Sequence, residues 1–197
     1  ASVYGLLLHS AGDLLCEGGE RVYERLLDFQ KRGLVKKIGV SVYDQREIDA
    51  VCGRYPIQLI QLPFNVFDQR LVRSGALKLL AEKGIEVHAR SAFLQGLLLM
   101  DPQTLPSHFG ATVRQQLARF QQTVGAQGIS PLAACLAFAI HRPEISSVIC
   151  GVNSAAQLRE ILEAARMSAD GSFDRIDFGS FALEDEAVLN PARWGKA

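Results

Sequence analysis

The sequence has no excess of charge of either sign and no long hydrophobic run. Its 197 residues include 21 basic and 21 acidic side chains, so the formal net charge is zero. No overall field therefore favours nucleic acid or an anionic membrane as a partner. The longest nearly apolar stretch, residues 131–140, has about half the length that a membrane-spanning helix needs. These absences argue against a nucleic-acid-binding protein and against a membrane protein.

Cysteine is sparse, and its positions form no recognisable pattern. The four residues, Cys16, Cys52, Cys135 and Cys150, include no C-x-x-C pair, which is the usual spacing of zinc and redox motifs. We therefore expect neither a metal site nor a disulfide framework, and reduced thiols favour a cytoplasmic location. The first residues also lack a basic segment followed by a cleavage site, so no signal peptide is predicted.

Short apolar runs that end in polar or glycine-containing segments recur along the chain. Five of them end at His9, Ser41, Gln61, Arg90 and the loop at Gly151, and each is followed by a helical stretch. Strands that alternate with helices favour a parallel sheet with right-handed crossovers. Because ligands bind at the carboxyl ends of parallel strands, these five positions predict a ligand site.

The predicted elements fill one α/β domain over residues 1–197. Strands are predicted over residues 3–9, 37–42, 57–62, 85–91 and 146–150. Helices are predicted over residues 20–32, 45–53, 72–83, 112–126, 131–141 and 155–167. Residues 94–111 form a long irregular segment, and the tail over 168–197 is expected to wrap around the outside with a short helix near 183–189. A chain of this length can bury roughly 70% of its unfolded surface.

Helix ends carry local signals of two kinds. Asp44 with Glu47 and Ser154 with Gln157 have the spacing of a capping box. Gly33, Gly84 and Gly128 each follow a helical stretch and precede an apolar residue, which is typical of a helix that ends at a left-handed glycine.

The residues around the five strand ends resemble those of the aldo-keto reductases. The resemblance lies in Leu-Leu-Leu-His-Ser at 6–10, Gly-Leu-Val-Lys-Lys-Ile-Gly-Val-Ser at 33–41, Gln-Leu-Pro-Phe-Asn at 61–65, the segment 84–98 that ends in Gln-Gly-Leu-Leu, and Gly-Val-Asn-Ser at 151–154 followed by Gln-Leu at 157–158. In this order they resemble strands four to eight of the family's (β/α)8 TIM barrel. The resemblance thus implies about five β/α units, with the N-terminal strands missing from this chain.

The resemblance implies an enzyme that transfers hydride between a nicotinamide cofactor and a small carbonyl or alcohol substrate. The family's catalytic site combines an Asp, a Tyr, a Lys and a His, and only the His position is present here, as His9. The tyrosines at positions 4, 23, 43 and 55 match no catalytic position. The isolated chain is therefore expected to be inactive.

For the cofactor, the resemblance implies NADP(H) in preference to NAD(H), and no metal. Ser41 and Gln61 match positions that hold the nicotinamide carboxamide, and Arg90 stands where many members have a Tyr that stacks on the nicotinamide. The phosphates are expected at the start of the last helix, where backbone N–H groups favour anions. The implied phosphate-binding residues are Gly151, Asn153, Ser154 and Gln157.

Three departures from the family pattern weaken individual cofactor contacts, and the one at Gly151 bears on the preference for NADP over NAD. Val42 replaces a usual Asn, Gly151 stands where members selective for the 2′-phosphate carry a basic residue, and Ile161 replaces an Asn that contacts adenine. Arg90 would also repel an oxidised nicotinamide, which is itself a cation.

Several of these residues also have purely structural interpretations. His9 could be a core histidine, Ser41 and Gln61 could satisfy backbone groups, and Arg90 could pair with a carboxylate. The histidines at 88, 108 and 141 are expected to be incidental, and the Lys36–Lys37 pair is expected to be a solvated turn. A second class of function also stays open, namely a non-catalytic nucleotide-binding or regulatory protein. In either case the open sheet edges predict self-association, pairing with a partner fragment, or neighbouring residues outside this sequence.

Overall fold

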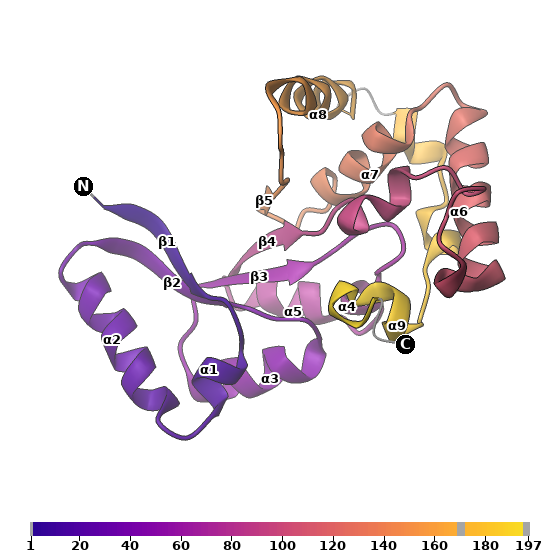
Figure 1. The fold of residues 1–197 in the computed structure, drawn as a ribbon. Coiled ribbons are helices and arrows are strands. Elements are labelled where there is room, and N and C mark those ends of the chain that lie inside the picture. The colour runs from indigo at the N-terminus through magenta and orange to yellow at the C-terminus, as the bar shows by residue number, and fades with distance from the viewer. Residues whose placement is uncertain (1, 169–171, 195–197) are drawn as a thin grey trace. The chain divides into compact units, whose positions relative to one another are not determined.

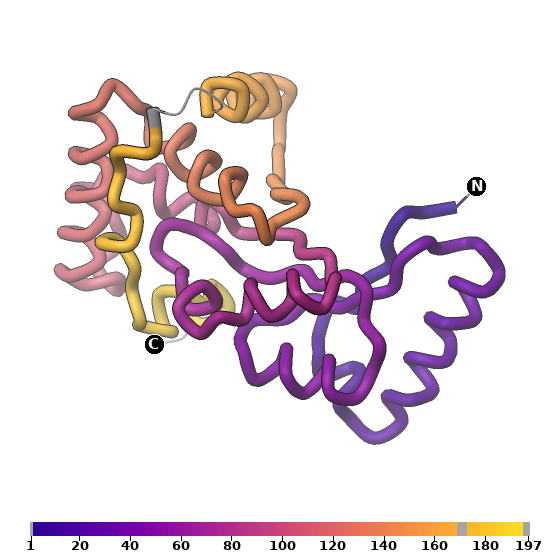
Figure 2. Tube along the Cα trace, turned by 180° about the vertical axis from the view of Figure 1, so that it is seen from behind, coloured from indigo at the N-terminus to yellow at the C-terminus, as the bar shows by residue number. Residues whose placement is uncertain are grey.

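A computed structural model of the protein describes residues 2–168 and 172–194. The predicted tail over 168–197 therefore lies partly outside the described residues. The chain separates into two compact units. The first unit comprises Ala1–Pro63, Arg70–Arg90 and Pro143–Ser147, and the second comprises Phe64–Gln69, Ser91–Arg142 and Val148–Ala197. Figures 1 and 2 trace the chain from indigo at the N-terminus to yellow at the C-terminus.

The sheet confirms the predicted α/β architecture. Its strands are β1 (Val3–Leu8), β2 (Val35–Ser41), β3 (Leu59–Pro63), β4 (Glu86–Arg90) and β5 (Ser147–Val148), and they follow one another in sequence order. The neighbouring pairs from β1 to β4 are parallel. Parallel pairing of consecutive strands requires a crossover between them, and the helices between the strands provide it.

The helices of the first unit cover one face of these strands. They are α1 (Gly12–Leu15), α2 (Gly19–Lys31), α3 (Gln45–Arg54), α4 (Arg70–Arg73) and α5 (Ala76–Glu82). α2 packs against β2 and α5 packs against β4, and Figure 1 shows α2, α3 and α5 along the same side of the strands. We call this side of the sheet the helix face and the opposite side the polar face.

The register of the strands assigns side chains to the polar face. Gly39 pairs with Leu59 and Ser41 pairs with Gln61, while Gln61 pairs with His88. Side chains of directly paired residues lie on the same face, and successive residues of a strand alternate between faces. The polar face therefore carries several charged and polar residues, namely Lys37, Ser41, Gln61, Glu86, His88 and Arg90.

Local signals explain most helix ends. The Asp44 side chain accepts a hydrogen bond from Glu47 N at 2.9 Å and begins α3, which confirms the predicted cap. Gly33, Gly84 and Gly128 have φ values of 69°, 66° and 73°, as expected for left-handed residues that end helices.

The structure differs from the predicted helix over 72–83, which is two helices. α4 ends at Arg73 and α5 begins at Ala76, because Gly75 between them has a φ of 78°. A left-handed residue cannot continue a right-handed helix. The apolar spacing runs through this break, so periodicity alone did not reveal it. The short α1 was also not predicted.

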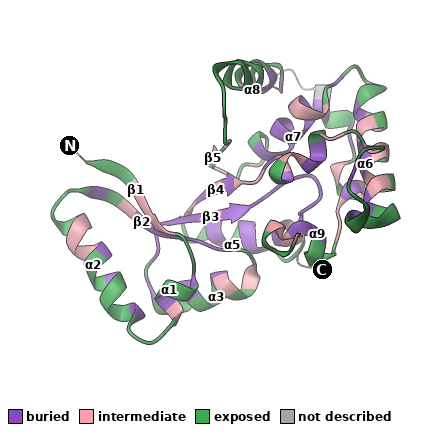
Figure 3. Cartoon of the chain, viewed as in Figure 1, coloured by how far each residue is buried: buried purple, intermediate pink, exposed green. Residues whose placement is uncertain are grey.

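The second unit is mostly helical. Its principal helices are α6 (Gly110–Gly125), α7 (Pro131–Ile140) and α8 (Ala155–Met167), with a short α9 (Glu186–Leu189) within the predicted 183–189 segment. Short 3-10 helices cover Leu94–Leu99, Ser107–Phe109, Ser172–Arg175, Phe178–Phe181 and Pro191–Arg193. α7 contacts both α6 and α8, so this apolar helix is packed on two sides. Figure 3 shows that α8 is largely exposed. No helix within the described residues is both long and apolar enough to cross a membrane.

Candidate functional site

The carboxyl ends of β2, β3 and β4 bring three of the predicted residues onto the polar face of the first unit. Ser41 is paired in register with Gln61, and Arg90 is the last residue of β4. Arg90 Nε donates a hydrogen bond to Ser41 Oγ at 3.3 Å. The structure therefore joins Ser41 and Arg90 directly and places Gln61 beside Ser41.

The Arg90 guanidinium is further held by the segment that follows β2. Its Nη2 donates to the carbonyl oxygen of Val42 at 3.4 Å, and its Cζ lies 4.4 Å from the centroid of the Tyr43 ring. A guanidinium stacks readily on an aromatic face. Sequence reasoning did not identify Tyr43, because its contact with Arg90 depends on how the chain turns after Ser41.

The Gln61 side-chain amide is half-buried and has no hydrogen-bond partner among the residues that the structure describes. A primary amide offers two donors and an acceptor, and the Ser41 hydroxyl can still donate its own proton while it accepts from Arg90. A nicotinamide carboxamide also needs both donors and acceptors. The side chains at this rim therefore fit the carboxamide of a nicotinamide cofactor.

His9 follows the last residue of β1. β1 pairs with β2 as far as Leu8, which lies opposite Val40. The next residue of each strand brings His9 level with Ser41. His9 is exposed and makes no hydrogen bond within the described part of the chain. In this structure it is not a core histidine.

The predicted phosphate-binding residues lie in the second unit, at the start of α8. The Ser154 side chain accepts a hydrogen bond from Gln157 N at 3.1 Å, and Gln157 Oε1 accepts one from Asn153 N at 2.8 Å. This reciprocal pair confirms the predicted capping box. A Cβ added at Gly151 would meet no described atom within 4 Å, so the turn is open on that side. β5 ends at Val148, two residues earlier than predicted.

Four residues of β1, β2 and β4 form a group that sequence reasoning missed. Glu86 Oε2 accepts hydrogen bonds from the Tyr4 hydroxyl at 2.6 Å and from Lys37 Nζ, and His88 Nε2 lies 2.7 Å from Glu86 Oε1. We call Tyr4, Lys37, Glu86 and His88 the Glu86 cluster. Lys37 is thus part of a strand and an ion pair rather than a solvated turn, and His88 is not incidental.

The Glu86 cluster strongly perturbs the carboxyl group at its centre. Burial is the largest single influence and by itself raises the pKa of Glu86. Hydrogen bonds from Lys37, Tyr4 and His88, together with the Lys37 charge, outweigh burial and lower the pKa to about 2. The hydrogen bond with Glu86 in turn raises the pKa of Lys37. The group is therefore a tightly paired ionic cluster at neutral pH.

In the part of the chain that the structure describes, the thiols form no reactive or metal-binding centre. The four cysteines are free, and burial raises the pKa of Cys52, Cys135 and Cys150. A thiol with a raised pKa is a poor nucleophile and a poor metal ligand, because less of it is ionised at neutral pH. Within the described residues, no three His, Cys, Asp or Glu side chains are grouped so that they could hold a metal ion.

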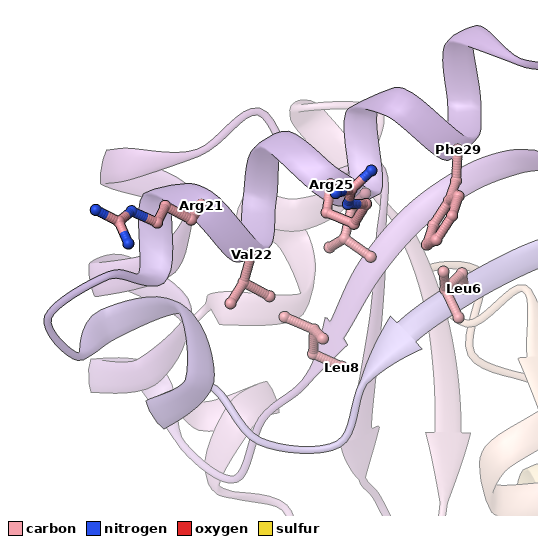
Figure 4. A pocket seen from close by; sticks show the side chains of 7 residues that line it. Leu6, Leu8, Arg21, Val22, Arg25 and Phe29 are labelled. Atoms are coloured by element: carbon pink, nitrogen blue, oxygen red, sulfur yellow. The ribbon is translucent and has the colours of Figure 1, made fainter.

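A groove of about 460 Å³ lies between β1 and α2 in the first unit. Figure 4 shows Leu6, Leu8 and Phe29 facing this space, with Arg21 and Arg25 on α2. Leu6 and Leu8 project to the helix face, since strand residues alternate in direction. The groove is therefore on the opposite side of the sheet from Ser41 and Gln61, and its apolar lining offers no reactive group.

Parallel strands linked by helices, with polar side chains at their carboxyl ends, place the chain among the β/α proteins, which bind ligands at that edge of the sheet. Residues 17–177, most of the chain, match the aldo/keto reductase family. The chain therefore belongs to the aldo/keto reductase family, a family of oxidoreductases that use nicotinamide cofactors. Its fold is a partial barrel of about five β/α units, as the resemblance implied.

Individual relatives agree with this assignment. The uncharacterized oxidoreductase YqkF of Bacillus subtilis is 25% identical over 154 residues, which are 74% of this chain and 50% of that protein. The aldo-keto reductase AKR11C1 of Bacillus halodurans, in its apo form, has a TM-score of 0.72 at 17% identity, over 98% of this chain and 65% of its own. The thermostable aldo-keto reductase Tm1743, in complex with the inhibitor epalrestat, has a TM-score of 0.63 at 18% identity, over 92% of this chain and 60% of its own.

The two solved structures share the fold of this chain at low sequence identity. The chain spans half of the length of YqkF and 65% of that of AKR11C1.

Proposed function

We propose that this chain binds NADP(H), in preference to NAD(H), and serves in the reduction of a small carbonyl compound or the reverse oxidation of an alcohol. One observation carries the proposal. The Gln61 amide lies beside Ser41 and Arg90 at the strand ends, and it has no hydrogen-bond partner among the described residues. Bound nicotinamide supplies the hydride that adds to the carbonyl carbon, while a proton adds to the oxygen.

Each residue at the rim has a definite task in this proposal. The Ser41 hydroxyl donates to the carboxamide oxygen, and the Gln61 amide completes the contact as donor and acceptor. Arg90 faces the nicotinamide ring from the end of β4. His9 donates a hydrogen bond to the carbonyl oxygen of the substrate and so orients it for hydride transfer.

The start of α8 binds the phosphates. Gly151, Asn153, Ser154 and Gln157 shape a turn that leads into a helix of 13 residues. The positive end of the helix dipole and its first N–H groups favour anions. Gly151 allows a close approach because nothing in the described structure fills the space beside it.

Titration with NADPH, followed by its fluorescence, tests the proposal. Gln61→Leu should weaken binding at least several-fold, because it removes the amide. Gly151→Glu should also weaken binding, because it adds a negative charge beside the phosphates. Gly125→Glu, which makes the same change at an exposed glycine at the end of α6, is the matched control. No binding by the unaltered chain, or equal effects of the two Glu substitutions, would contradict the proposal.

The same titration with NADH decides the cofactor preference. Arg159 is the basic residue nearest to the turn in sequence, and it lies on the first turns of α8. We expect tighter binding of NADPH than of NADH, and Arg159→Gln should reduce the difference. Equal affinities for the two cofactors would refute the preference for NADP(H).

The isolated chain holds cofactor without turnover. Tyr4, Tyr23 and Tyr55 donate their hydroxyls to Glu86, to the carbonyl of Pro56 and to the carbonyl of Leu14, so they are engaged elsewhere. An assay of NADPH oxidation with small aldehydes should show no activity above background. The chain is a non-catalytic nucleotide-binding or regulatory protein if it binds cofactor and if no extended form of the polypeptide shows turnover.

Self-association through β1 is the second part of the proposal. β1 lies at one end of the strand order, and Val3 and Tyr4 are 55% and 50% exposed. An exposed edge strand is a template for pairing. Sedimentation velocity should show species larger than a monomer at micromolar concentration, and a monomer at all concentrations would refute this part. The free thiols are in keeping with a cytoplasmic site of action, which fractionation of cells would test.

A further inference from the structure

We infer that Arg90, held by Tyr43, makes the nicotinamide subsite selective for the redox state of the cofactor, so that the reduced form binds more tightly than the oxidised form. This inference rests on the proposed function, since it concerns the same subsite. It adds a property, charge discrimination, and a residue, Tyr43, which the motifs do not indicate.

The guanidinium is fixed from three sides by one short segment. Ser41 accepts from Nε at 3.3 Å, the carbonyl of Val42 accepts from Nη2 at 3.4 Å, and the Tyr43 ring lies 4.4 Å from Cζ. These three residues are consecutive, so one turn of the chain supplies three contacts that hold the cation. Arg90 is therefore a preorganised charge rather than a mobile one.

Tyr43 is itself anchored to the start of α3. Its backbone N–H donates to Glu47 Oε2 at 2.6 Å, and Glu47 N donates to the Asp44 side chain at 2.9 Å. This cap fixes the backbone of Tyr43 at the point where its ring meets the guanidinium. Tyr43 is thus a positioning residue that acts through Arg90.

The two redox forms of nicotinamide differ by one positive charge on the ring. The reduced ring is neutral and can stack on a guanidinium, whereas the oxidised ring is a cation and is repelled by it. Repulsion between two unit charges a few ångströms apart near a protein surface changes affinity on the order of tenfold or more. Ser41 and Gln61 are uncharged, so their contacts with the carboxamide do not oppose this discrimination.

The selectivity favours cofactor exchange in the direction of carbonyl reduction. The reduced cofactor would be captured more readily, and the oxidised cofactor would be held less tightly and would leave sooner. The hydride-transfer step itself would become slightly less favourable, because tenfold tighter binding of the reduced form raises the midpoint potential of the bound couple by about 30 mV.

The test measures the dissociation constants of NADPH, by fluorescence, and of NADP⁺, by calorimetry, on each variant of the full 197-residue chain. The readout is the ratio of the two constants. A substitution that damages the fold should weaken the binding of both cofactor forms equally and leave the ratio of the two dissociation constants unchanged. Loss of the charge should change that ratio. In the unaltered chain we expect the dissociation constant of NADP⁺ to be about ten or more times that of NADPH.

The variants separate charge from positioning. Arg90→Met, which keeps the length of the side chain and removes its charge, should lower the ratio about tenfold, while Arg90→Lys should retain most of it. Tyr43→Leu should lower the ratio in part, and Tyr43→Phe, which keeps the ring, should restore it. An unchanged ratio in Arg90→Met, or a ratio near one in the unaltered chain, overturns the inference and leaves the proposed function standing. If neither form of the cofactor binds, both this inference and the proposed function are overturned.

Discussion

Replacing Glu86 by glutamine removes the charge at the centre of the Glu86 cluster and keeps the size of the side chain. Two strands lie between β1 and β4, so the hydrogen bond from Tyr4 to Glu86 links the first strand to the fourth. Lys37, which lies on β2, forms an ion pair with the same carboxylate, so a third strand is linked to it. The cluster therefore ties β1, β2 and β4 together, and the substitution should lower the stability of the first unit.

The size of the effect follows from the pKa of Glu86. The cluster lowers it from the ordinary value of 4.5 to about 2, and a fall of this size corresponds to about 3 kcal/mol. The Lys37 side chain is 34% exposed, so solvent screens part of the interaction. We therefore expect Glu86→Gln to reduce the free energy of unfolding at pH 7 by about 1–2 kcal/mol.

The sign of the pH dependence is also fixed. Because the pKa of Glu86 is lower in the folded state than in the unfolded state, its stabilisation is complete above pH 4.5 and is lost as the pH falls toward 2. Urea unfolding followed by circular dichroism at pH 7, 4 and 2.5 should show the difference between the unaltered chain and Glu86→Gln shrinking in that order.

Glu82→Gln is the matched control for this experiment. Glu82 pairs with Lys78 at 3.9 Å on the surface of α5 and is 60% exposed, so the same chemical change should alter stability by less than about 0.5 kcal/mol. If Glu86→Gln behaves like this control at pH 7, or if its effect persists at pH 2.5, the stabilising role of the cluster is refuted.

Substitutions at three further positions test the packing and capping described above, all by urea unfolding. Gly39→Ala should cost about 2 kcal/mol or more, because the new Cβ would lie 2.0 Å from the carbonyl oxygen of Leu59; a stability equal to that of the unaltered chain would show that β2 and β3 do not approach so closely. Gly53→Ala, at a position in α3 with nothing within 4 Å, should instead stabilise by about 0.5–1 kcal/mol. Asp44→Ala should cost about 1 kcal/mol, since Glu47 N loses its partner, and Asp44→Asn should recover most of that loss.

The strand ends and the helix caps could be predicted because their signals are local. Ser154 and Gln157 are three residues apart, the spacing of a capping box; Ser154 Oγ accepts from Gln157 N, and Gln157 Oε1 accepts from Asn153 N. Ser41 and Gln61 could be placed at one rim because parallel strands align their carboxyl ends. The family motifs added a role for each position, but they did not supply the contacts between positions.

The contacts that the sequence did not reveal depend on register or on how loops turn. Lys37 and Glu86 are 49 residues apart, and only the pairing through β2, β3 and β4 brings them onto one face. In the sequence, Lys37 stands beside Lys36 just after a helix, which is typical of a solvated turn. Tyr43 lies two residues beyond the motif that ends at Ser41, and its ring reaches Arg90 only after the chain turns toward α3.

The polar face therefore carries two groups of residues with different physical character. In the Glu86 cluster, both oxygens of Glu86 are paired with protein groups, and its depressed pKa is the mark of a satisfied ion pair. At the carboxyl ends, Gln61 and His9 have no hydrogen-bond partner among the described residues, and Arg90 is held with its charge at the rim. Polar groups that are already satisfied stabilise a fold, whereas polar groups held in place without partners are available to a ligand. Substitutions at Glu86 should thus change stability with little effect on the ratio of NADPH to NADP⁺ affinity, and substitutions at Arg90 should do the reverse.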